Sequence, residues 1–333
     1  MSLATKPTIG RAAEFRDPNI RRTPLGLGCA GLMQIPSQRQ RQRLLGEAHA
    51  QGLSHFDVAR MYGLGMAESE LGRFARGRRG QVTIATKFGI EPGSPRLARL
   101  QAPARAALAR LPALRAALKR RGSGGSHPPR RYDAAIAQAS LETSLRELGT
   151  DYVDVFFVHD PAPSDHVDLD GLGELCEELI ESGKIRAWGI SGDPDPCAEL
   201  SRAAAGSVLQ VRDEIFAPFR PTPGPASRTI AFGVLAGALS RIQAHLAADA
   251  GRRSRWRTEV GLDCGDAEVL SSLLLRDALD RNPGGTVLFG TTRPERIGLA
   301  VAAADPDAHD ADSLRAFREC VRRDFHGGGS ELG

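Results

Sequence analysis

The sequence predicts an α/β fold, a (β/α)8 TIM barrel formed by one domain over residues 1–333. Short apolar segments alternate with amphipathic ones along the chain, which is the pattern of parallel βαβ units. Some apolar segments, such as Val155–Val158, are unbroken runs of valine and phenylalanine, as in strands buried on both faces. Eight such units close naturally into a barrel, and 333 residues suffice for one. An open, doubly wound sheet is the alternative.

The expected strands follow one another at intervals that leave room for helices. They are Leu25–Cys29, His55–Ala59, Val82–Lys87, Val153–His159, Ala187–Ser191, Val208–Asp213, Thr229–Phe232 and Val287–Gly290. Helical periodicity predicts helices over Ser37–Gln51, Met66–Ala75, Ala134–Leu148, Leu169–Ser182, Asp195–Ala205 and Asp266–Arg281. No Gly-x-Gly-x-x-Gly follows a strand, so the open sheet lacks a dinucleotide-binding fingerprint in its favour.

A basic segment interrupts this pattern after the third strand. Residues 91–131 contain ten Lys and Arg but one acidic residue, Glu91, and the rest of the chain has a net charge of −5. We expect an insertion or lid on the face where barrel loops build active sites. Nucleic-acid binding is not favoured, because residues 91–131 contain no Phe, Tyr or Trp for base stacking, and the first such residue after them is Tyr132. Residues 326–333 are expected to form a flexible tail.

Cysteine usage and hydropathy exclude several classes of protein. The five cysteines are scattered and form no Cys-x-x-Cys pair, so neither a metal site nor a disulfide framework is expected. No apolar stretch approaches the ~20 residues of a membrane span, and residues 1–10 do not resemble a secretion signal. We therefore expect a cytoplasmic protein without a membrane partner.

Polar residues at or after the ends of three expected strands suggest a proton-transfer site. Asp57, Lys87 and His159 come at strand ends, and Tyr62 follows Asp57 in a glycine-punctuated loop. A phenol is a poor acid at neutral pH, and a neighbouring ammonium would lower its pKa. Lys87 can supply that charge, Asp57 can orient Lys87, and His159 can position a carbonyl oxygen. Each residue alone also has an ordinary structural explanation, so the inference depends on the set.

Several motifs in order resemble the aldo-keto reductase family, over residues 23–300. They are Phe56-Asp57-Val-Ala-Arg-Met-Tyr62-Gly, Glu68-Ser-Glu-Leu-Gly72, Ala85-Thr-Lys87-Phe-Gly89, Leu141-Glu-Thr-Ser-Leu-Arg-Glu-Leu-Gly-Thr-Asp-Tyr-Val-Asp154, Gly183-Lys-Ile-Arg-Ala-Trp-Gly-Ile-Ser191 and Phe289-Gly-Thr-Thr-Arg-Pro-Glu-Arg296. The resemblance implies a barrel, carbonyl reduction with NADPH rather than NADH, and Tyr62 as general acid assisted by Asp57, Lys87 and His159.

The resemblance also implies a set of cofactor-binding residues along the rim. They are Gly28, Ser191, Gln210, Phe232, Leu235, Gly237, Thr291, Arg293 and Arg296. Ser191 and Gln210 would hold the nicotinamide carboxamide, and Thr291 and Arg296 the adenosine 2′-phosphate. The sequence departs from the family at Gly192, Leu299 and Ala300, where polar side chains are usual.

Two other functions use the same residues. The site could oxidise a sugar or an alcohol, or the barrel could bind NADPH as a regulatory module with little turnover. The substrate is expected to be a small carbonyl or sugar-like molecule, but the loops of a barrel choose it and these loops match no known specificity. The sequence does not indicate an oligomeric state.

Overall fold

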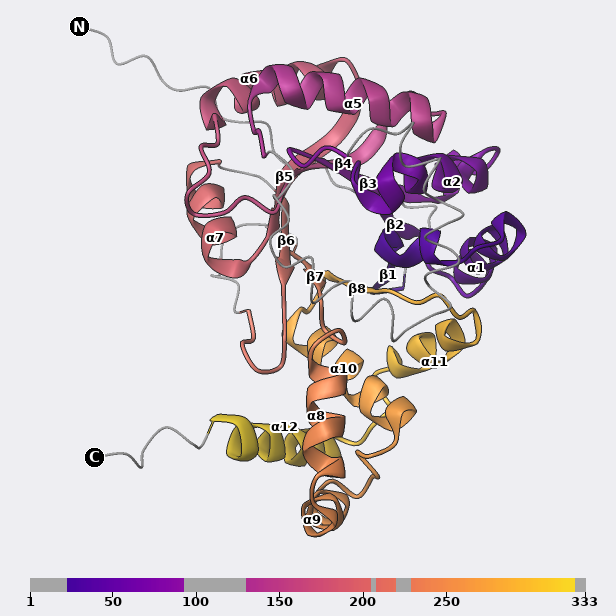
Figure 1. Ribbon diagram of the computed structural model, residues 1–333, viewed down its shortest axis with the longest axis vertical. Coiled ribbons are helices and arrows are strands. Elements are labelled where there is room, and N and C mark those ends of the chain that lie inside the picture. Colours follow the sequence, from indigo (N-terminus) through magenta and orange to yellow (C-terminus); the bar gives the residue numbers. More distant parts are fainter. Residues whose placement is uncertain (1–22, 93–129, 205–207, 220–228, 327–333) are drawn as a thin grey trace, which may run out of the picture.

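The computed structural model describes residues 23–92, 130–204, 208–219 and 229–326 (Figure 1). Its eight strands are parallel and form a closed barrel, in which each strand neighbours the next in sequence and β8 returns to β1. The predicted (β/α)8 barrel is thus confirmed, and the open sheet is excluded. The basic insertion lies largely outside the described residues, so its role as a lid stays a prediction.

The strands agree with the expected segments to within two residues at either end. They are β1 (Leu25–Gly28), β2 (His55–Asp57), β3 (Thr83–Phe88), β4 (Val153–His159), β5 (Ile185–Gly192), β6 (Val208–Arg212), β7 (Thr229–Phe232) and β8 (Thr286–Phe289). The agreement reflects the apolar runs, because both faces of each strand are covered.

All six expected helices form. They are α1 (Gln38–Ala50), α2 (Met66–Ala75), α5 (Ala134–Leu148), α6 (Leu169–Glu181), α7 (Pro194–Ala203) and α10 (Ala267–Arg281). Four other described helices had no expected counterpart: α8 (Ala238–Ala247), α9 (Ala250–Val260), α11 (Glu295–Ala303) and α12 (Ala311–His326). Helix α12 includes His326, so placing this residue in a flexible tail was wrong. Residues 327–333 lie outside the described ranges.

Side chains fill the inside of the barrel. Val155, Phe157 and Ile230 belong to a buried interior cluster distinct from the shell between strands and helices. The neighbour of Phe157 in β5 is Gly189, and a Cβ on that glycine would lie 3.0 Å from Cε1 of Phe157 and 1.9 Å from the carbonyl oxygen of Val208. The packed interior leaves the C-terminal rim of the strands as the place for a site.

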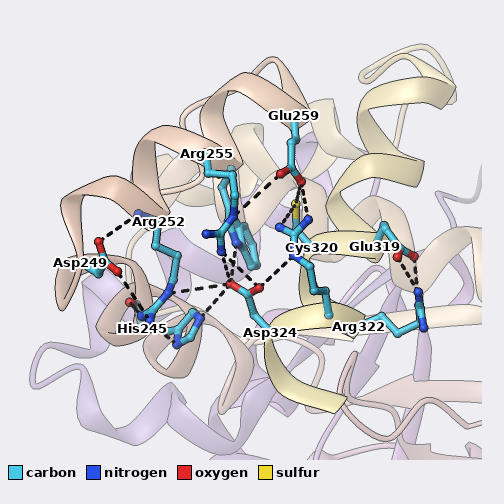
Figure 2. Close-up of polar contacts among 11 residues, drawn as sticks. His245, Asp249, Arg252, Arg255, Glu259, Glu319, Cys320, Arg322 and Asp324 are labelled. Atoms are coloured by element: carbon cyan, nitrogen blue, oxygen red, sulfur yellow. Dashed lines mark hydrogen bonds and ion pairs between the residues drawn. The ribbon is translucent and has the colours of Figure 1, made fainter. Parts of the chain in front are cut away.

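Helices α8, α9, α10 and α12 enclose a second apolar cluster beside the barrel (Figure 1). The indole N–H of Trp256 on α9 donates to Asp324 on α12 at 2.9 Å, and His245 on α8 lies 3.1 Å from the same carboxylate. Figure 2 shows His245, Arg252 and Arg255 gathered around Asp324. These contacts link α8, α9 and α12, three helices that were not predicted from the sequence.

Two further observations concern the described part of the chain. None of its helices is long and apolar enough to cross a membrane. Its histidines, cysteines and carboxylates form no group of three that could hold a metal ion.

Candidate active site

Four polar residues come together at one rim of the barrel. Asp57 ends β2, Lys87 lies one residue before the end of β3, and His159 ends β4. Tyr62 opens the short 3-10 helix η2 (Tyr62–Gly65), which follows β2. Parallel strands present all their C-terminal ends at the same rim, so residues far apart in the sequence become neighbours.

Asp57 and Lys87 form a buried ion pair at the centre of this rim. The ammonium of Lys87 donates to both carboxylate oxygens of Asp57 at 2.6 Å and to the carbonyl of Val58 at 3.0 Å. The three N–H groups are thus satisfied, as a buried charge requires. Burial lowers the pKa of Lys87, and the carboxylate of Asp57 opposes that change.

Tyr62 and His159 lie beside the ion pair. The nitrogen of the Lys87 ammonium is 5.4 Å from the centre of the Tyr62 ring. The ring centres of Tyr62 and His159 are 5.9 Å apart, with the rings edge to face. A phenol, an imidazole and an ammonium therefore share one small volume at the end of the barrel.

The pKa of Tyr62 differs from the expectation. Burial, followed by the nearby carboxylate of Asp57, raises the phenol pKa well above its ordinary value. The lowering of the pKa expected from Lys87 was wrong, because burial of the phenol and the charge of the Asp57 carboxylate dominate at this position. The phenol of Tyr62 is protonated at neutral pH, as a proton donor must be, but in this cofactor-free state it is a weaker acid than an ordinary tyrosine.

His159 is uncharged at neutral pH. Burial lowers its pKa to about 3, and the cations Lys87 and Arg130 add to the effect. Its Nδ1 is buried and has no hydrogen-bond partner among the described residues. The hydroxyl of Tyr132 donates to the backbone carbonyl of His159 at 2.7 Å and holds the end of the strand. A neutral imidazole can donate a hydrogen bond without competing with Tyr62 as the acid.

The glycine-punctuated loop sets the position of Tyr62. Gly63, Leu64 and Gly65 have φ values of 57°, 60° and 85°, so the chain turns through left-handed conformations before α2. A Cβ on Gly63 would lie 2.1 Å from Cγ of Met33, so a larger residue would displace the turn. The glycines that flank Leu64 are therefore explained by the left-handed turn, which places Tyr62.

A second buried ion pair supports this loop, and the sequence analysis gave it no role. Arg60 lies 2.6 Å from Glu68, a fully buried residue at the start of α2. The hydroxyl of Thr86 donates to the other oxygen of Glu68 at 2.7 Å, which links α2 to β3 next to Lys87. The sequence does contain a hint of this ion pair, because Arg60 and Glu68 have opposite charges and lie on either side of Tyr62.

Ser191 is the penultimate residue of β5, Gln210 is the middle residue of β6, and the two are paired in register. The hydroxyl of Ser191 donates to Oε1 of Gln210. Nε2 of Gln210 donates to Asp57 at 2.7 Å, so Gln210 contacts the ion pair directly and Ser191 contacts it through Gln210. Gly28 lies at the end of β1 in register with Asp57. A Cβ there would approach only the carbonyl oxygen of Phe289, at 3.7 Å.

The positions that depart from the family pattern also have a local explanation. A Cβ on Gly192 would lie 3.2 Å from Cα of Asp160 and 3.5 Å from Sγ of Cys197. An asparagine at this position would therefore require the neighbouring chain to shift. Leu299 is 43% exposed on α11, whereas Ala300 is buried.

Phe232, Leu235 and Gly237 follow one another from the end of β7 to the start of α8. Phe232 has a neighbour that was not predicted from the sequence: the guanidinium of Arg212 lies 5.2 Å from the centre of its ring, a cation–π distance. Nε of Arg212 also donates to Asp193 at 2.8 Å. Arg212 could have been suggested from the sequence, because it ends β6 two residues after the predicted site residue Gln210.

Thr291, Arg293 and Arg296 lie in the loop after β8 and in the first turn of α11. The hydroxyl of Thr291 accepts from the backbone N–H of Arg293 at 3.0 Å. Both arginines are exposed, and neither has an ion pair within the described ranges. Two unpaired guanidinium groups at a helix N-terminus fit a phosphate group. The loop also borders a hollow of about 550 Å³ beside Arg43 and Glu47.

Comparison with known proteins gives a consistent result. The profile of the Aldo/keto reductase family matches residues 24–211. A 6-dehydroglucose reductase from Agrobacterium fabrum is 33% identical over 147 residues, which are 43% of this chain and 40% of that protein. The aldo-keto reductase yakc from Schizosaccharomyces pombe, named for NADP(+), is 28% identical over 202 residues, 59% of this chain and 49% of the relative. The matches thus span less than half of these relatives.

Solved structures of similar fold extend over most of the chain. Aldo-keto reductase AKR11C1 from Bacillus halodurans has a TM-score of 0.63 at 20% identity and covers 89% of this chain and 91% of its own. An aldo-keto reductase from Klebsiella pneumoniae in complex with NADPH has a TM-score of 0.61 at 20% identity. The match covers 91% of this chain and 95% of that one. At such identities the likeness concerns the fold.

Proposed function

The chain belongs to the aldo/keto reductase family, and on that premise we propose that it is an oxidoreductase that reduces an aldehyde or a ketone with NADPH. The observation that carries the proposal is the buried Asp57–Lys87 pair with Tyr62 and His159 beside it. These four residues provide a proton donor, a hydrogen-bond donor and a charge that can stabilise an oxyanion. Carbonyl reduction needs these functions when a hydride attacks the carbon.

Each residue has a step that follows from its geometry. Tyr62, protonated at neutral pH, gives its proton to the carbonyl oxygen of the substrate. Neutral His159 donates an N–H bond to the same oxygen and orients it. The Lys87 ammonium, at 5.4 Å from the phenol ring centre, stabilises the phenolate that Tyr62 becomes, and Asp57 keeps Lys87 in place. NADPH, when bound, supplies the hydride.

Reduction uses the protonated form of Tyr62, whereas oxidation of an alcohol by the same residues uses its phenolate. The raised pKa of Tyr62 makes the phenolate rare near neutral pH. The same residues would favour oxidation only at alkaline pH.

Arg293 and Arg296 support NADPH as the cofactor in preference to NADH. Two exposed guanidinium groups beside the N-terminus of α11 suit an adenosine 2′-phosphate, which NADH lacks. Ser191, Gln210 and Phe232 would hold the nicotinamide end. Replacing Arg296 by alanine should weaken NADPH binding by about 10-fold or more and leave NADH binding nearly unchanged. The exposed Arg257 on α9 provides a control alanine variant.

The substrate is a small carbonyl compound, and sugar carbonyls are the first class to screen. One relative is named 6-dehydroglucose reductase, and another, from Escherichia coli, L-glyceraldehyde 3-phosphate reductase. The half-buried Asp160 and Arg130, next to His159, offer polar groups that suit hydroxyl-rich molecules.

The experiment that tests the function is the Tyr62→Phe variant. Carbonyl-dependent oxidation of NADPH should fall by about 10²–10⁴-fold, because only the acid is lost, while NADPH should still quench the protein fluorescence. Tyr152 is a matched control, because Arg79 covers its ring and no described hydrogen bond uses its hydroxyl. If Tyr62→Phe turned over as fast as Tyr152→Phe, Tyr62 would not be the acid.

A further inference from the structure

Gln210 contacts the ion pair as well as the predicted nicotinamide site. Its Nε2 donates to Oδ2 of Asp57 at 2.7 Å, and its Oε1 accepts from the hydroxyl of Ser191. The exposed fractions are 1% for Gln210, 2% for Ser191 and 4% for Asp57. These bonds are shielded from water, so each is worth more than an exposed one.

The bond between Gln210 and Asp57 crosses the barrel. Strands β6 and β2 lie four positions apart in a closed order of eight, on opposite sides of the rim. The bond therefore completes a chain of polar contacts from Ser191 on β5, through Gln210 and Asp57, to Lys87 on β3. A change at the nicotinamide end of this chain can reach the proton-donating end without moving the backbone.

The chemistry of the partners sets the orientation of the Gln210 amide. The carboxylate of Asp57, paired with an ammonium, only accepts hydrogen bonds, so the NH₂ group must face it. The amide oxygen then faces Ser191, whose hydroxyl donates to it. Oδ2 of Asp57 receives one bond from each side, from Lys87 and from Gln210. Without the second donor, the carboxylate could turn away from its symmetric contact with the ammonium.

We propose that Gln210 is a positioning residue for the proton donor: it holds Asp57 against Lys87, and so couples the nicotinamide site to the acid strength of Tyr62. The inference rests on the proposed function and deepens it. Asp57 acts on the phenol of Tyr62 through its charge, so a shift of the carboxylate changes the acid. Gln210 itself acts through Asp57 and needs no contact with the substrate.

A Gln210→Met variant separates this role from cofactor binding. Methionine has a similar volume but no donor, so kcat at saturating NADPH should fall by about 10- to 100-fold. The dissociation constant for NADPH, from fluorescence quenching, should rise by a smaller factor than kcat falls, because only one of the contacts proposed for the cofactor is lost and Arg293 and Arg296 are unchanged. Gln42 is a matched control, since its amide contacts the carboxylate of Glu70 outside the site, and Gln42→Met should keep kcat. A weaker affinity with an unchanged kcat in Gln210→Met would overturn the proposal.

A Gln210→Glu variant adds a pH signature that a merely structural residue would not produce. The titratable groups that act with Asp57 here are Lys87 from β3, Tyr62 from η2 and Cys29 after β1. At high pH the introduced carboxylate repels Asp57, and at low pH its protonated form donates a bond in place of the amide. The ratio of variant to wild-type kcat should rise as the pH falls. A ratio independent of pH would contradict the positioning role.

One measurement is independent of turnover. In the cofactor-free protein, the side-chain amide protons of Gln210 should be protected from exchange in NMR spectra and should lose protection in Asp57→Ala. Rapid exchange in the wild type would overturn the contact. If no carbonyl substrate were reduced although this protection was found, the proposed function would fail and the contact would stand.

Discussion

The buried, uncharged His159 makes the stability of the protein depend on acid in a predictable way. Its pKa is about 3 in the folded protein against an ordinary value of 6.5. Below pH 6.5 the unfolded chain binds a proton at this position that the folded protein does not. The free energy of unfolding therefore falls as the pH decreases from this value, and the loss ends only near pH 3.

The size of the effect follows from linkage between protonation and folding. One pKa unit corresponds to about 1.4 kcal/mol, so His159 should remove about 2 kcal/mol of stability between pH 7 and pH 5. The His159→Asn variant lacks this group. Its free energy of unfolding should therefore fall by about 2 kcal/mol less than that of the wild type over the same interval.

Urea unfolding followed by circular dichroism at several pH values measures this difference. The slopes against urea should be equal, so that midpoints report stability. His166 is exposed, and His166→Asn serves as the control that should retain the wild-type pH dependence. Parallel curves for wild type and His159→Asn would refute the reasoning, because they would mean that the imidazole becomes protonated within the folded protein.

Further predictions concern other buried contacts. Lys87→Met leaves the carboxylate of Asp57 buried without its cation, and should lower the free energy of unfolding by about 3–5 kcal/mol; in urea unfolding, the double variant with Asp57→Asn should recover much of this. A Cβ on Gly72 would lie 2.2 Å from the carbonyl oxygen of Leu148. The Gly72→Ala variant should therefore have a free energy of unfolding lower by about 1–3 kcal/mol. An unchanged Tm would contradict the close packing of α2 on α5. Asp324→Ala removes the carboxylate that His245, Arg252 and Arg255 share (Figure 2) and that accepts from Trp256. It should lower the free energy of unfolding by about 2–4 kcal/mol, and chemical unfolding with no loss would show that these contacts do not contribute to stability.

Local pattern was sufficient for the barrel because each strand carries its own signal. Val153–His159 was expected with the bounds that β4 has, since Val155–Val158 form an unbroken apolar run of the kind found in strands buried on both faces. Helices α9 and α12 were not predicted, because both segments are polar on average. Arginines crowd both segments, and their apolar residues meet in a separate cluster that exists only when α8, α9, α10 and α12 pack together.

For the candidate site, too, the sequence predicted some properties and only the structure showed others. Asp57, Tyr62, Lys87 and His159 could be named from the sequence because chain order and strand direction place strand ends on one rim. The electrostatic state of Tyr62 could not, since it depends on how deeply the ring is buried and on which partner takes the charge of Lys87.

The sequence by itself therefore determined the fold class, the rim and the residues that gather there. Those properties follow from periodicity, strand direction and residue type, which are local. Only the tertiary structure decided that Gln210 reaches across the barrel to Asp57 and that His159 is uncharged. Contacts between residues 153 positions apart, and the loss of water around an imidazole, arise when the strands close into a barrel.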